Sequence, residues 1–156
     1  SDIRFLIIGK GKEENSIYNY ANELGVLNNN LFFIRELPKN YIVNIYSAAS
    51  VCTSLFLPLK EMEANSANKF FDALAAGKPI MINYKGWQAK LIEEYNVGIV
   101  APSNNATLAA KELEALISDK KRLSSNGKAA KELASKYFDR DKLYRSFESV
   151  FLGVSN

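Results

Sequence analysis

The chain has 156 residues, 47% of them hydrophobic, and its 20 basic and 17 acidic side chains give a formal net charge of +3. This length and apolar content fit one globular domain with a buried core, and they exclude an intrinsically disordered chain. Lysine and arginine are spread along the sequence without a basic block. Nucleic-acid binding is therefore not indicated, whereas a mildly anionic ligand is allowed.

The residue types that are scarce narrow the chemistry further. The sequence has no histidine, which excludes His-based catalytic triads, and its single cysteine leaves few ways to build a zinc site. Any metal would need carboxylate ligands alone, and we expect none. The lone Cys52 cannot form an internal disulfide, which predicts a reducing compartment and a buried, unreactive thiol. No apolar run approaches the roughly 18 residues of a membrane span.

Short apolar runs that end in turn residues predict five strands. The first, IRFLII, is almost continuously apolar and ends at Gly9, which is typical of a strand buried on both faces of a parallel sheet. Because this strand starts at once, without an initiator methionine, we expect the sequence to be a piece of a longer protein. The five expected strands cover residues 3–8, 31–34, 51–57, 80–83 and 98–100.

Helical periodicity fills the segments between these strands. Ile17, Tyr20, Ala21 and Leu24 recur at helical spacing before Gly25, a typical helix stop. After residue 102 only helices are expected. The predicted helices cover residues 13–24, 41–49, a stretch within 65–79 that closes at Gly77 and Pro79, 88–95, 107–118, 120–137 and 139–151.

This alternation predicts an α/β fold: a Rossmann-like, doubly wound parallel sheet of about five strands with a helical C-terminal tail. We expect a single domain over residues 1–156, in which strands and helices alternate up to 101 and the tail covers 102–156. Ligands of such sheets bind at the carboxyl ends of the strands. The sequence therefore places a site in residues 9–12, 35–38, 58–68 and 84–87.

The stretch NSANKFFDALAAGKP predicts an anion site at a helix start. Asn65 or Ser66 is a suitable N-cap, which would leave the backbone N–H groups of Ala67, Asn68 and Lys69 pointing toward the ligand edge of the sheet. Helix N-termini attract phosphates, and the Lys69 side chain would add a full positive charge. The alternative is an ordinary capped helix that faces water.

Asp72 is the one carboxylate in this otherwise apolar helix. It lies one turn after Asn68 and Lys69, opposite the face that Phe70, Ala73 and Leu74 would bury. It either forms a surface ion pair with Lys69 or accepts hydrogen bonds from the vicinal hydroxyls of a sugar. Its position alone does not decide between the two.

The other motifs carry little information by themselves. The GKG turn at Gly9 and Gly11 is not the full dinucleotide-binding fingerprint, because position 14 is glutamate where a third glycine is needed. Glu61 and Glu63 lie near Asp72 in sequence but do not form a metal-binding pattern. Tyr84 and Trp87 flank Gly86 after a strand, where aromatic residues pack more often than they line a cleft.

Together, several segments resemble a known family in the same order along nearly the whole chain. They are the GKG turn, NNNLFFIRELP, IYSAASVCTSLFLPL, NSANKFFDALAAGKPIMI, GWQAKLIEEYNVGIVAPSNN and FDRDKLYRSFESVF. The sequence is similar to the C-terminal, nucleotide-sugar-binding domain of GT-B-fold glycosyltransferases. It resembles most the large retaining family four, and within it the members that build bacterial capsule or lipopolysaccharide sugars.

The resemblance implies roles for particular residues. Asp72 takes the place of the carboxylate, more commonly glutamate, that binds the ribose hydroxyls of the donor nucleotide. The amides of Ser66, Ala67 and Asn68 would face the diphosphate or the donor sugar. The base would lie against the loop at Glu36 and Leu37, and the turn with Gly9 and Gly11 would also contact the donor nucleotide.

The sequence departs from the family pattern at two places. Many relatives have a second glutamate eight residues before the ribose carboxylate, near the donor sugar, but position 64 is alanine here, and Glu61 or Glu63 is the candidate substitute. The relatives also have diphosphate-binding basic residues and a whole acceptor-binding domain in a part that would precede Ser1. No catalytic residue is identified from the sequence.

The resemblance implies the donor-binding half of a glycosyltransferase, which transfers a sugar from a UDP-linked donor to a capsule or lipopolysaccharide-type acceptor. The nucleotide sugar is a co-substrate and no further cofactor is expected. We expect the half alone to be inactive and the protein to be cytoplasmic, with any peripheral membrane association a property of the full enzyme. The alternative is a non-catalytic, flavodoxin-like interaction module; a dinucleotide oxidoreductase is disfavoured because the third glycine is missing.

Overall fold

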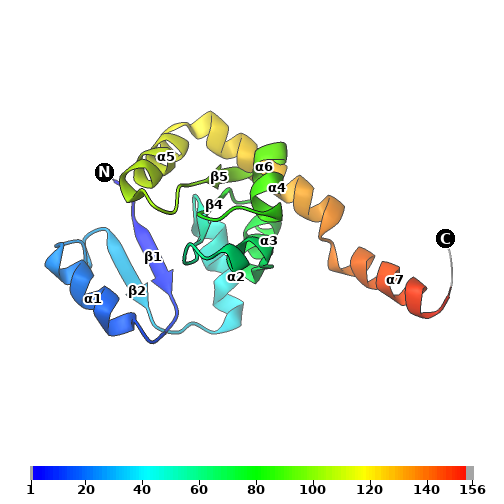
Figure 1. Ribbon diagram of the computed structural model, residues 1–156, viewed down its shortest axis with the longest axis horizontal. Helices are drawn as coiled ribbons and strands as arrows, with labels where there is room; N and C mark the ends of the chain where they lie inside the picture. Colours follow the sequence, from blue (N-terminus) through cyan, green and yellow to red (C-terminus); the bar gives the residue numbers. More distant parts are fainter. Residues whose placement is uncertain (1, 154–156) are drawn as a thin grey trace. The chain divides into compact units, whose positions relative to one another are not determined.

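The computed structural model describes residues 2–153 and divides the chain into two compact units, Ser1–Ile45 and Tyr46–Asn156 (Figure 1). Each unit is described by itself. The first contains β1 (Phe5–Ile8), α1 (Glu14–Glu23) and β2 (Leu31–Ile34), and α2 (Lys39–Ala48) crosses the boundary. β1 and β2 are parallel, with Phe5 opposite Leu31 and Ile8 opposite Ile34.

The burial of β1 differs from the expectation of a strand covered on both faces. Phe5, Leu6 and Ile7 are 41%, 44% and 43% exposed. The sheet of this unit has only two strands, and α1 buries a single residue, Ala21. One short amphipathic helix cannot cover both faces of a strand, so the apolar run alone overestimated the burial of β1.

The second unit is built on the parallel sheet β3-β4-β5. Its strands are β3 (Cys52–Ser54), β4 (Ile80–Ile82) and β5 (Gly98–Val100). The helices are the 3-10 helix η1 (Lys60–Ala64), α3 (Asn68–Ala75), α4 (Trp87–Tyr95), α5 (Ala106–Ser118), α6 (Lys120–Tyr137) and α7 (Arg140–Phe151).

β4 separates two apolar cores because successive strand residues point to opposite faces of a sheet. Ile80 and Ile82 belong to a buried cluster with residues of α3, α4 and α6, whereas Met81 belongs to a second cluster with Leu113 and Leu116 of α5. All three β4 residues are buried. The sheet of this unit is thus covered by helices on both faces, with α5 on one and α3, α4 and α6 on the other (Figure 1).

α3 ends at a glycine turn against α6. Gly77 has φ +65°, and the N–H groups of Gly77 and Lys78 donate to the carbonyls of Leu74 and Ala73, which satisfies the last turn of the helix. A Cβ on Gly127 of α6 would lie only 2.7 Å from the Gly77 carbonyl oxygen. The turn that ends α3 and the backbone of α6 therefore lie closer together at these two glycines than a side chain on Gly127 would allow.

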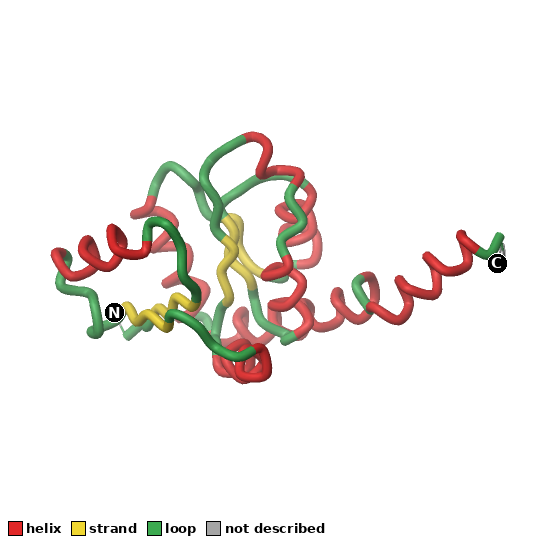
Figure 2. The backbone as a smooth tube through the Cα atoms, turned by 90° about the horizontal axis from the view of Figure 1, so that it is seen from below, coloured by secondary structure: helices red, strands yellow, loops and turns green. Residues whose placement is uncertain are grey.

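The last helix, α7, makes little contact with the rest of the second unit and projects beyond the end of α6 in both views (Figure 2). Its apolar side chains share one face at helical spacing and are exposed. They are Leu143 at 52%, Tyr144 at 63%, Phe147 at 64% and Phe151 at 76% exposed. Within residues 2–153, no helix has both the length and the apolar character needed to cross a bilayer.

The predicted fold class is confirmed: five parallel strands alternate with helices and a helical tail follows, although their hydrogen bonds form two sheets. The strand predicted over residues 51–57 is shorter, because the backbone of Phe56 pairs with the Asn83 side chain instead of a strand. The 3-10 helix η1 was not predicted. That the whole chain forms one domain remains a prediction.

We expect Gly98→Ala to destabilise the protein by about 3 kcal/mol or more, because the added Cβ would lie 1.8 Å from the Ile80 carbonyl oxygen in the central sheet. Urea unfolding measures the effect. Gly11→Ala is the control, since its Cβ would meet nothing within 4 Å. Equal midpoints for the two variants would contradict the close β4–β5 approach.

Burial raises the pKa of the Cys52 thiol to about 11, and the nearby Lys78 charge opposes this only in part. At pH 8 we therefore expect a disulfide reagent to modify Cys52 roughly 100-fold more slowly in the folded chain than in urea. Similar rates in the two states would show that the thiol is accessible and ionised in the native protein.

Candidate functional site

α3 begins without a side-chain cap. Its N-cap is Ala67, with φ −69° and ψ 124°, and not Asn65 or Ser66 as the sequence predicted. The Asn65 side chain instead accepts a hydrogen bond, at 3.1 Å, from the N–H of Ala67, the residue that directly precedes the helix. The first N–H groups of a helix have no partner within it, so those of Asn68 and Lys69 stay available to an anion.

Asp72 is exposed on the face of α3 opposite the buried residues Phe70, Ala73 and Leu74, as its spacing predicted. The alternative surface pair with Lys69 does not form: among residues 2–153 the ion pairs join Lys10 to Glu36 and Arg35 to Glu14. The carboxylate is therefore free of an ionic partner in the described part of the chain. It lies one helical turn from the open N–H groups of the helix start.

The charge of Asp72 acts on Tyr46, a residue near the end of α2. Burial, then the charge of Asp72, then Cys52 raise the pKa of Tyr46 to about 12. The Lys78 ammonium is engaged elsewhere, donating a hydrogen bond of 2.7 Å to the Ser47 carbonyl. The charge of Asp72 therefore bears on the Tyr46 phenol, and the Lys78 ammonium bonds to the backbone.

Glu61 and Glu63 lie in η1, and both are exposed. They belong to the connection between β3 and α3, residues 55–67, which we call the β3–α3 loop. The two glutamates thus lie on the loop that leads into α3, and a role for them in contacts to a donor sugar remains a prediction. Ala64, at the position of the missing family glutamate, is the last residue of η1.

The segment after β4 contacts the β3–α3 loop at several points. The Asn83 side chain accepts a hydrogen bond from the Phe56 N–H and donates one to the Phe56 carbonyl, both at 2.8 Å. The Trp87 indole N–H donates to the Asn65 carbonyl at 3.0 Å. The backbone of Gly86 lies so close to Glu63 that a Cβ would be 2.0 Å from its carbonyl oxygen.

Tyr84 and Trp87 are packing residues, the commoner of the two possibilities. Tyr84 is buried, donates a 2.6 Å hydrogen bond to the Gln88 side chain and contacts the Phe56 ring edge-on at 5.2 Å. The half-buried Trp87 ring lies 6.0 Å from those of Phe70 and Phe71. These aromatic residues hold the loop and α3 together.

The remaining predicted residues belong to the first unit. Gly9 has φ +140°, and its N–H donates to the Ile34 carbonyl at 3.0 Å, which ties the GKG turn to the end of β2. Glu36 is exposed and pairs with Lys10 at 3.5 Å, and Leu37 is half-buried. The ion pair joins the loop after β1 to the loop after β2. A role of Gly9, Gly11, Glu36 and Leu37 in binding a nucleotide remains a prediction.

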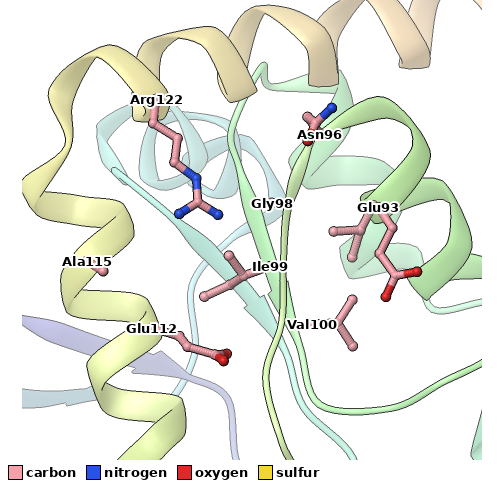
Figure 3. Close-up of a pocket in the computed structure, with 9 residues that line it drawn as sticks. Glu93, Asn96, Gly98, Ile99, Val100, Glu112, Ala115 and Arg122 are labelled. Carbon is pink, nitrogen blue, oxygen red and sulfur yellow. The ribbon is translucent and has the colours of Figure 1, made fainter.

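The structure also contains a hollow of about 500 Å³ along β5, which the sequence did not predict (Figure 3). Glu112 of α5 and Arg122 of α6 line one side, and Glu93 of α4 lines the other (Figure 3). None of the predicted site residues lines it. Its residues are spread over four elements and form no motif. Among residues 2–153 no group of three or more acidic or cysteine side chains is placed to hold a metal ion.

Comparison with protein families connects these features to known proteins. Residues 1–133 match the model of the family described as glycosyl transferases group 1. The chain belongs to this family. No curated protein sequence matches the chain.

Three solved structures show the same fold as this group 1 glycosyl transferase chain. HepE of Anabaena, in complex with UDP-glucose, has a TM-score of 0.81 at 15% identity over 96% of this chain and 41% of its own. WaaG, a glycosyltransferase involved in lipopolysaccharide biosynthesis, has a TM-score of 0.71 at 18% identity over 94% of this chain and 37% of its own. The C-terminal domain of LpcC from Francisella tularensis has a TM-score of 0.72 at 15% identity over 88% of this chain and 70% of its own.

The family match confirms the predicted family. The structural likenesses confirm the predicted fold, that of the C-terminal, Rossmann-like domain of GT-B glycosyltransferases. The chain spans about two-fifths of the length of HepE and WaaG.

The raised pKa of Tyr46 predicts a loss of stability at high pH. Unfolded tyrosine ionises near pH 10 but folded Tyr46 only near pH 12, so its contribution to the free energy of unfolding is complete below pH 10 and is lost between pH 10 and 12. We expect Tyr46→Phe to weaken this decline in urea unfolding. Asp72→Asn should end the decline at a lower pH, because it removes a charge that raises the pKa.

The matched control is Tyr144→Phe, which changes an exposed tyrosine of α7 and should keep the alkaline decline of the unmodified chain. An Asp72→Asn profile identical to that of the unmodified chain would show that the charge of Asp72 does not act on Tyr46.

Proposed function

We propose that this chain is the donor-binding part of a retaining hexosyltransferase that transfers a sugar from a UDP-linked donor to a capsule or lipopolysaccharide-type acceptor. One observation carries the proposal: Asp72, an exposed carboxylate that has no ionic partner among residues 2–153, lies one turn beyond the start of α3, which has no side-chain cap. This places an acceptor of hydrogen bonds and an anion-binding helix end on the same short helix.

The two features suit the two parts of a nucleoside diphosphate. The start of α3 carries about half a positive charge, and the N–H groups of Asn68 and Lys69 can donate to a phosphate, to which the Lys69 side chain adds a full charge. The two oxygens of Asp72 can each accept a hydrogen bond from one ribose hydroxyl. One turn of helix, roughly 5.4 Å, separates the two contacts.

The relatives support the nature of the donor and the acceptor. HepE is described in complex with UDP-glucose, which favours a UDP-linked sugar as the donor. WaaG acts in lipopolysaccharide biosynthesis, which favours a saccharide acceptor of the cell envelope. Both are about two and a half times as long as the match, and the proposal assigns the acceptor site to the part of such an enzyme that this chain does not cover.

The chemistry of such a transfer rests on position and charge more than on a nucleophile of this chain. When the bond between sugar and diphosphate breaks, negative charge develops on the leaving phosphate, and the α3 N–H groups and Lys69 would stabilise it. Asp72 would hold the ribose and so fix the diphosphate along the helix axis. The chain alone is expected to bind the donor without turnover.

Further residues are proposed to complete the donor site. Ser66 and Ala67 precede the helix, and Glu61 and Glu63 on the β3–α3 loop are the candidates for contacts to the donor sugar. These assignments rest on the family resemblance.

The test is a calorimetric titration of the chain with UDP. We expect Asp72→Ala to weaken UDP binding roughly tenfold or more, because hydrogen bonds to a charged acceptor are lost. Asp72→Glu should retain most of the affinity. The control is Asp141→Ala, which removes an exposed carboxylate in the first turn of α7.

Equal UDP affinity in Asp72→Ala and the unmodified chain would reject the ribose contact. A chain that binds NADH and not UDP would be a dinucleotide-binding domain instead. A chain that binds neither would favour the interaction module. A thermal-shift series with UDP, GDP and NADH separates these outcomes, because a ligand that binds only the folded state raises the melting temperature.

A further inference from the structure

The β3–α3 loop has little packing of its own. Leu57 is 72% exposed, Leu55 and Leu59 are about half exposed, and the side chains of Glu61 and Glu63 face solvent. A segment with so few buried contacts opens easily unless other parts of the fold hold it. The loop nevertheless has to present the two glutamates and the start of α3 in one arrangement if it is to bind a sugar diphosphate.

The first contact that holds the loop is made by a side chain, which pairs with the loop backbone as a neighbouring strand would. Asn83 follows β4 directly, and its amide group makes two hydrogen bonds of 2.8 Å to the N–H and carbonyl of Phe56. The Phe56 ring packs edge-on against Tyr84, at 5.2 Å between centroids. The beginning of the loop is thereby fixed in both direction and register.

The second contact depends on a glycine. Gly86 has φ +103°, a conformation that residues with a side chain rarely adopt, and a Cβ there would lie 2.0 Å from the Glu63 carbonyl oxygen. Only glycine lets the backbone of η1 lie this close to the turn after β4. The position of Glu63 is therefore set by backbone packing against this turn.

The third contact fixes the end of the loop. The Trp87 indole donates a 3.0 Å hydrogen bond to the Asn65 carbonyl, while the Asn65 side chain bonds to the Ala67 N–H and the Met62 carbonyl. The Trp87 ring also packs 6.0 Å from those of Phe70 and Phe71 in α3. One residue of α4 thus joins η1 to the first turn of α3.

We infer that Asn83, Gly86 and Trp87 are positioning residues for the donor sugar: they hold the β3–α3 loop so that Glu61, Glu63 and the start of α3 face the sugar diphosphate together. This inference rests on the proposed function. The three residues do not touch the donor and act through the loop. Loosening the loop should therefore weaken contacts to the sugar more than the ribose contact of Asp72, which lies on the helix beyond the loop.

The experiment compares UDP-glucose with UDP in calorimetric titrations of the chain. Trp87→Phe keeps an aromatic ring against Phe70 and Phe71 but removes the N–H that bonds to Asn65. We expect the ratio of UDP-glucose affinity to UDP affinity to fall roughly fivefold, the effect of one lost hydrogen bond in the loop. Tyr95→Phe is the matched control, because it removes a hydroxyl from the same helix where it contacts Tyr137 and not the loop.

Asn83→Ala is the second variant, since it removes the two hydrogen bonds to Phe56 that hold the beginning of the loop, and Asn83 follows β4 and does not belong to α4. Amide hydrogen exchange supplies an independent measurement: in both variants we expect faster exchange at Met62 and Asn65, whose N–H groups bond within the loop, and unchanged exchange in α6. A merely structural role would lower stability without changing the affinity ratio.

The outcomes separate this inference from the proposed function. If the unmodified chain binds no UDP, the proposed function fails and the inference fails with it. If it binds UDP and UDP-glucose but both variants keep the affinity ratio of the control, the positioning inference alone is wrong. A lowered ratio together with faster exchange confined to the loop supports it.

Discussion

The second unit depends on the two-sided burial of a strand of three residues, β4. Ile80 and Ile82 enter the core with α3, α4 and α6, while Met81 enters the core with α5. Because side chains alternate along a strand, a shift of one residue would turn each of them toward the wrong core. The register of β4 therefore sets the core against which α3 packs and the place of the turn after β4, and both segments carry the candidate site.

Much of this fold follows from local pattern, and the exceptions have identifiable causes. The apolar runs of residues 31–34 and 98–100 and the periodicity of 120–137 coincide with β2, β5 and α6. The strand expected to reach residue 57 ends at Ser54, because the Asn83 side chain takes the backbone groups of Phe56. No propensity of the loop could reveal this, since the two residues are far apart in sequence.

In the candidate site, too, some features follow from local sequence pattern and others depend on tertiary contacts. The side of α3 on which Asp72 lies follows from helical spacing, which predicts that the carboxylate lies opposite Phe70, Ala73 and Leu74. The N-cap was misplaced because Asn65 bonds to the Ala67 N–H before the helix and not within it. The contacts of Gly86 and Trp87 with the loop, like the hollow along β5, arise from tertiary packing and leave no signal in short motifs.

The contact of Gly127 with Gly77 has a consequence for the direction of α3. α3 has 8 residues, whereas α6 has 18 and is the longest helix that the described residues form. The Gly127 backbone packs against the turn that ends α3, so α6 sets the direction of the α3 axis. The dipole of α3 points along the same axis. A bulkier residue on α6 would tilt that axis, so a mutation far from the start of α3 would redirect the N–H groups that we propose for phosphate binding.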